Sequence, residues 1–97
     1  MSDNEIIKQI KSLETVIRGY GVDKLYLFGS AQRGDFTDES DVDVLVDFMP
    51  KQKNFSNFMG LYLDLEKTLA RKIDLVTRTS LYHKMKPEVY ATMQRLL

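Results

Sequence analysis

Apolar residues recur along this chain with two different spacings, which separate predicted helices from predicted strands. From residue 6 they follow the three- and four-residue steps of one helix face, at Ile6, Ile10, Leu13 and Ile17. Gly19 and Gly21 are expected to end this first helix, since glycine favours helix C-termini. A second amphipathic helix is predicted over residues 55–69, with its stripe at Phe55, Phe58, Met59, Tyr62, Leu65 and Leu69.

Three shorter segments predict strands. Residues 24–28 are rich in leucine and aromatic residues, residues 41–48 read Asp-Val-Asp-Val-Leu-Val-Asp-Phe, and residues 72–77 alternate around Asp74. The first two strands are joined by a compact loop, which allows an antiparallel pair. The helix between the second and third strands favours a parallel, right-handed crossover. Residues 81–97 are expected to be helical on either side of Pro87, which ends or kinks the first piece.

This order of elements predicts a single α/β (α+β) domain, residues 1–97, with a small mixed β-sheet backed by helices. Its 97 residues suit one small domain, and 14 acidic against 14 basic residues argue against bulk nucleic-acid binding. The absence of cysteine excludes disulfides and thiol nucleophiles. The acidic start lacks a signal-peptide pattern, and no apolar run reaches the roughly 20 residues that a membrane span needs. A soluble, cytoplasmic protein is expected.

Asp41 and Asp43 are the first candidate functional residues. Alternate residues of a strand share one face, so the two carboxylates would project together, with Cα atoms about 6.6 Å apart. Carboxylate oxygens suit Mg²⁺, which would also relieve their mutual repulsion. Taken alone, an Asp-x-Asp pair is more often the solvated face of an edge strand.

Asp74 favours the metal site over a solvated strand face, because it interrupts an otherwise apolar strand. If the third strand lies beside the second, its carboxylate can face Asp43. As a third acidic group it could deprotonate or orient an attacking hydroxyl in a two-metal displacement. Taken alone, Asp74 would more often be a solvent-facing strand residue.

The Gly29-Ser30 pair directly follows the first predicted strand. Glycine permits close approach of the backbone to a ligand, and backbone N–H groups there can bind phosphate oxygens. Arg33 lies close enough in sequence to contact the same anion or to brace a carboxylate. The full pattern is Gly29-Ser30-x-x-Arg33-Gly34-x₅-Ser40-Asp41-x-Asp43, whose fixed positions would rarely coincide by chance.

That pattern resembles the signature of the DNA polymerase beta-like nucleotidyltransferase superfamily. At this length the chain is similar to the minimal nucleotidyltransferases, the MntA-type antitoxins that are paired with HEPN-domain ribonuclease toxins. The resemblance implies a nucleotidyltransferase-like fold, two Mg²⁺ ions held by Asp41, Asp43 and Asp74, and ATP as substrate. It implies nucleotide binding by Gly29, Ser30, Arg33 and Ser40.

The implied reaction is transfer of AMP from ATP to a tyrosine of the partner toxin. Two alternatives stay open: an antitoxin that blocks its toxin by binding alone, and a nucleotidyltransferase that acts on a small molecule or an RNA end. His83 is expected to be a surface or helix-packing residue. Lys51 and Lys53 are expected in a solvated loop, with partner contact there as the lesser alternative. The acceptor, the base preference and the oligomeric state are left undetermined.

Overall fold

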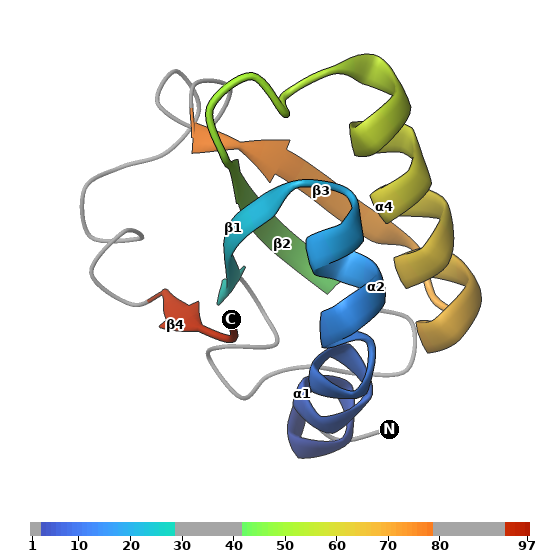
Figure 1. Ribbon diagram of the computed structural model, residues 1–97. Coiled ribbons are helices and arrows are strands. Elements are labelled where there is room, and N and C mark those ends of the chain that lie inside the picture. Colours follow the sequence, from blue (N-terminus) through green and yellow to red (C-terminus); the bar gives the residue numbers. More distant parts are fainter. Residues whose placement is uncertain (1–2, 29–41, 79–92) are drawn as a thin grey trace.

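The computed structural model describes residues 3–28, 42–78 and 93–97, which build a mixed sheet with helices packed on one face (Figure 1). The described strands lie in the order β3-β2-β1-β4. Along the chain the elements are α1 (Asp3–Ser12), α2 (Glu14–Gly19), β1 (Val22–Phe28), β2 (Val42–Phe48), α4 (Phe55–Leu69), β3 (Ile73–Thr77) and β4 (Gln94–Arg95).

The predicted strand directions are confirmed. β1 and β2 are antiparallel, and β2 and β3 are parallel with α4 as the crossover between them. Alternate strand residues point to opposite faces, and the helix-covered face is apolar throughout. Its main core cluster contains Leu25, Leu27, Val42, Val44, Val46, Ile73 and Leu75 from the strands, packed with Ile6, Ile10, Ile17, Leu61, Leu65 and Leu69 from the helices.

The first helix is divided where a continuous one was predicted. Ile6, Ile10 and Ile17 are fully buried, so the predicted apolar face is confirmed. The helix nevertheless breaks at Leu13, between α1 and α2. The Ser12 hydroxyl donates to the Gln9 carbonyl at 2.6 Å, and such a side-chain bond competes with helix continuation.

A tyrosine ties the end of α2 to α4. The Tyr20 ring lies over Gly60, where an added Cβ would come within 2.4 Å of the ring. One helical turn further on, Asp64 accepts a hydrogen bond from the Tyr20 hydroxyl. The small residue at position 60 therefore permits a contact that the carboxylate then fixes.

The end of the chain corrects the predicted helical tail. Residues 94 and 95 form β4, a short strand antiparallel to β1, with Arg95 opposite Tyr26 and Gln94 opposite Leu27. Leu96 and Leu97 are buried in the main core. Pairing of the free edge of β1, together with burial of the two leucines, outweighs the helical propensity of this segment. The rest of the predicted tail, with His83, lies outside the described residues.

Within the described ranges, no helix has the length and apolar composition that a bilayer-crossing segment requires.

Candidate functional site

Asp43 and Asp74 occupy paired positions on adjacent strands. In the parallel register of β2 and β3, Asp43 lies opposite Asp74. Neighbouring strands are about 4.8 Å apart, so the two Cα atoms are near neighbours. Asp43 is half-buried and Asp74 is exposed.

The two carboxylates share the face of the sheet that is opposite the main core. Their strand neighbours Val42, Val44, Ile73 and Leu75 all point into the helix-covered core. Because side chains alternate along a strand, Asp43 and Asp74 must project from the other face. On β1, Phe28 lies opposite Asp43 in the antiparallel register. The sequence places Gly29-Ser30 immediately after Phe28 and Asp41 immediately before β2.

All of the other predicted site residues lie outside the described part of the chain. These are Gly29, Ser30, Arg33, Ser40 and Asp41. Within the described ranges, no three acidic or histidine side chains gather as a ready metal site. The described geometry therefore provides two of the three predicted carboxylates. Both belong to the all-oxygen donor type that Mg²⁺ prefers.

The other end of the same sheet face carries a charged cluster that the sequence did not predict. Arg78 Nε and an Arg78 terminal nitrogen donate to the two Asp47 carboxylate oxygens at 3.2 and 2.8 Å. The guanidinium also lies 5.5 Å from the centre of the Tyr26 ring. The hydrogen bond with Asp47 is the main cause of a raised Arg78 pKa, while burial acts in the opposite direction. The cluster connects β3, β2 and β1 across this face.

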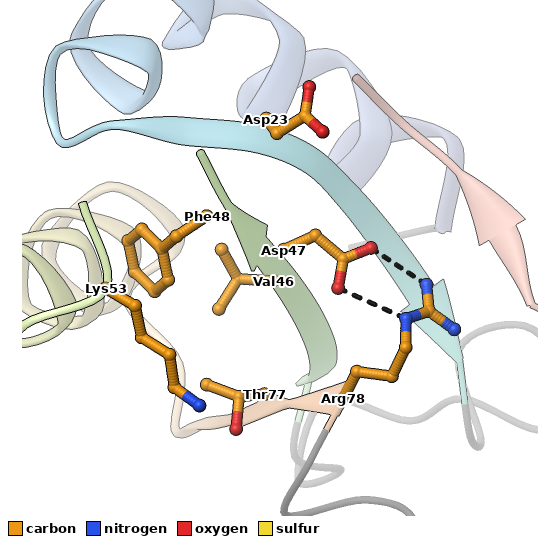
Figure 2. Close-up of a pocket in the computed structure, with 7 residues that line it drawn as sticks. All are labelled: Asp23, Val46, Asp47, Phe48, Lys53, Thr77 and Arg78. Atoms are coloured by element: carbon orange, nitrogen blue, oxygen red, sulfur yellow. Dashed lines mark hydrogen bonds and ion pairs between the residues drawn. The ribbon is translucent and has the colours of Figure 1, made fainter. Parts of the chain in front are cut away.

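This cluster borders a pocket of about 300 Å³ (Figure 2). The pocket is lined by Asp23, Val46, Asp47, Phe48, Lys53, Thr77 and Arg78. It lies at the C-terminal ends of β2 and β3. Asp47 is four residues beyond Asp43, about 13 Å along an extended strand. The pocket is therefore separate from the Asp43–Asp74 pair.

The cluster of Asp47, Arg78 and Tyr26 was predictable from the sequence only in part. Asp47 has the same strand parity as Asp43, which places both on one face. Arg78 directly follows β3, whose parallel register brings it beside the end of β2. The parity was available from the sequence alone, whereas the pairing of Asp47 with Arg78 required the strand register.

Comparison with known proteins gives the family. A model of the nucleotidyltransferase domain matches residues 4–95. A provisionally named protein adenylyltransferase of Methanocaldococcus jannaschii is 42% identical over 65 residues, 66% of this chain and 65% of that protein. The protein adenylyltransferase MntA of Thermococcus cleftensis is 40% identical over 62 residues, 64% of this chain and 62% of that protein. The matched segment thus spans just under two thirds of each relative.

Solved structures agree on the fold. A provisionally named minimal nucleotidyltransferase has a TM-score of 0.74 at 23% identity, covering 95% of this chain and 89% of that one. A toxin–antitoxin crystal structure with AMP-PNP has a TM-score of 0.64 at 22% identity, covering 100% of this chain and 73% of that one. With the family match over nearly the whole sequence, these likenesses show that the chain belongs to the nucleotidyltransferase domain family.

Proposed function

We propose that this chain transfers AMP from ATP to a hydroxyl group of a partner protein, most simply a tyrosine of a HEPN-type ribonuclease toxin that it thereby neutralises. The observation that carries the proposal is the opposed pair Asp43 and Asp74 on one face of adjacent parallel strands. Support comes from the two relatives named as protein adenylyltransferases and from the toxin–antitoxin structure of the same fold.

The residues fit a divalent metal site. Asp43 and Asp74 supply oxygen ligands from one face, and Asp41 would add a third from the residue before β2. Two Mg²⁺ ions bound there would neutralise charge on the phosphates as the reaction proceeds. Gly29, Ser30, Arg33 and Ser40 would bind the triphosphate and hold it in line with the acceptor.

The reaction then requires loss of a proton from the acceptor hydroxyl and displacement of pyrophosphate at the α-phosphorus. The acceptor oxygen forms a bond to the α-phosphorus of ATP. The bond from that phosphorus to the bridging oxygen of the β-phosphate breaks, and pyrophosphate leaves. Asp74 is exposed and can accept or orient the proton of the attacking hydroxyl. Asp43, half-buried and backed by the core, holds a fixed position beside it.

The test uses ATP labelled at the α-phosphate, Mg²⁺, this chain and the separately purified protein encoded beside its gene. We expect the label on the neighbour, and its loss when Asp43→Asn or Asp74→Asn replaces the native chain. Glu14→Gln is the control, since Glu14 is an exposed acidic residue of α2 that is paired with Arg18 and belongs to neither the carboxylate pair nor the pocket. Lack of labelling by the folded native chain would refute the proposal.

The same variants separate catalysis from inhibition by binding alone. If Asp43→Asn still neutralises the neighbour's ribonuclease activity in full, the chain acts as a binding antitoxin. If neutralisation is lost while the fold is retained, transfer is the means of neutralisation.

A further inference from the structure

The connection between β2 and α4 is held in one conformation by its own hydrogen bonds. The Met49 N–H donates to the Gly21 carbonyl at 2.8 Å, and the Gln52 N–H donates to the Met49 carbonyl at 3.0 Å. The side-chain Nδ2 of Asn57 then donates to the backbone carbonyl of Gln52 at 2.8 Å. At Gly21, whose φ is +82°, any Cβ would collide with Gln52. These contacts connect residues 49–55, hereafter the docking loop, to Gly21 and to the first turn of α4.

The docking loop exposes large apolar side chains. Phe55 is 80% exposed and Met49 is 50% exposed. Phe55 is the first residue of α4, where the N-cap bond from the Asn57 N–H to Asn54 already satisfies the helix end without it. An aromatic side chain exposed to this extent is the kind of residue that anchors protein–protein interfaces.

The same segment carries two lysines and no acidic residue. From Phe48 to Leu63 the charged residues are Lys51 and Lys53, and the segment contains no aspartate or glutamate. Both lysines are exposed, and neither forms an ion pair within the described residues. This local excess contrasts with the zero net charge of the whole chain.

The pocket beside the loop offers a place for an acidic side chain. Lys53 extends along one side of it, with Phe48 and Thr77 nearby (Figure 2). The Asp47 carboxylate is directed toward Arg78 on the far side and is neutralised there. A carboxylate that enters on the Lys53 side would meet the Lys53 ammonium beside Phe48 and Val46. The other acidic lining residue, Asp23, has its carboxylate turned away from Lys53 (Figure 2).

We propose that the docking loop and this pocket bind a partner protein through an acidic surface with an apolar centre. The apolar centre packs on Phe55 and Met49, and acidic side chains pair with Lys51 and Lys53. Two cations are few for a nucleic acid, whose binding rests on many phosphate contacts, so the exposed aromatic and thioether favour a protein. The identity of this partner with the adenylylated protein rests on the proposed function.

The location separates docking from transfer. The docking loop leaves the C-terminal end of β2 (Figure 1), whereas Asp43 is the second residue of that strand. The five residue-to-residue steps from Asp43 to Phe48 span about 16 Å of extended strand. The docking loop is therefore distinct in position from the Asp43–Asp74 pair, and this surface acts as a recruitment site for the partner.

The experiment measures binding of the full chain to the protein encoded beside its gene without ATP, using calorimetry for the Kd and stopped-flow fluorescence for the association rate. We expect Phe55→Ser to raise the Kd by about 30-fold or more. We expect Lys51→Glu/Lys53→Glu to slow association about tenfold and to remove most of its salt dependence. Leu63→Ser, at an exposed apolar residue, and Lys8→Glu/Lys67→Glu, at two exposed lysines, are the controls away from the loop and should leave the Kd unchanged.

The outcomes are distinguishable. No complex, or a complex with the same Kd in Phe55→Ser, overturns the docking site even if labelling from ATP proceeds. A tight, Phe55-dependent complex without labelling retains the docking site and refutes the proposed transfer. Two further results also overturn the inference: self-association of the chain that Phe55→Ser abolishes, seen by sedimentation, and binding of fluorescent single-stranded RNA that the two lysine substitutions abolish.

Discussion

The two faces of the sheet differ in what they contain. The helix-covered face is apolar from edge to edge, with Leu25, Val44 and Leu75 among its buried side chains. The opposite face has a small apolar centre of Phe28 and Leu45, with Asp43 and Asp74 toward one end and Asp47 with Arg78 toward the other. Folding free energy is therefore concentrated on one face and polar chemistry on the other, so substitutions should separate the two.

The largest effect should come from Asp43→Asn on the polar face. Loss of a metal ligand is expected to lower the transfer rate about 10²–10³-fold, because it removes several kcal/mol of charge stabilisation. The thermal midpoint should stay close to that of the native chain. Rates of labelling from ATP, measured beside thermal unfolding, check both parts. If Asp43→Asn lowered the thermal midpoint as much as a substitution in the main core does, the proposed division of roles between the two faces would be wrong.

On the apolar face, Leu27→Ala should mainly affect stability. Leu27 is fully buried in the main core, and its truncation should lower the free energy of unfolding by about 3 kcal/mol. Urea titration measures the change. Val76→Ala, on the opposite face and only partly buried, is the comparison and should have a smaller effect. Equal losses from the two variants would show that both faces contribute alike to stability.

The Asp47–Arg78 pair should contribute less than either of these effects. The Arg78 side chain is 49% exposed and that of Asp47 is 23% exposed, so solvent screens their attraction despite the two parallel hydrogen bonds. A double-mutant cycle with Asp47→Asn and Arg78→Gln should give a coupling of about 1 kcal/mol or less that falls with added salt. A coupling that does not respond to salt would indicate a desolvated pair.

The smallest effect should be a pH dependence at the contact between α2 and α4. The hydrogen bond with Asp64 is the main cause of the raised Tyr20 pKa, with burial and the charge of Asp64 adding to it. Its stabilising contribution is complete below about pH 10 and is lost as the pH rises through the folded-state pKa. Tyr20→Phe should therefore be less stable than the native chain at pH 8, and the difference should shrink above pH 10. Denaturant titrations at both pH values test this.

Hydrophobic periodicity predicted the sheet correctly where the pattern was strict. The alternation around Asp43 and Asp74 predicted which residues face the core, and the register of β2 and β3 bears this out. It failed where local signals compete with tertiary ones. The break at Leu13 occurs beside a side-chain hydrogen bond from Ser12, and β4 pairs with a strand edge that no local pattern reveals.

The sequence predicted one part of the candidate site and missed another. Strand parity placed Asp43 on the correct face, and the crossover rule placed β3 beside β2. The Asp47–Arg78–Tyr26 cluster needed the pairing of three strands, and so could not be read from spacing. Gly29, Ser30, Arg33, Ser40 and Asp41 remain predictions that labelling experiments with single substitutions can test.

The position of β2 inside the sheet affects how much the backbone of Asp43, the proposed metal ligand, can move. β2 is hydrogen-bonded to a strand on each side, whereas β3 pairs only with β2 within the described sheet. Amide protons of such a strand exchange with solvent mainly when the whole domain opens. Asp43 therefore projects from a backbone that fluctuates little, and Asp74 from one with more freedom. Slow deuterium uptake along β2 would provide a record of global unfolding that is independent of any catalytic readout.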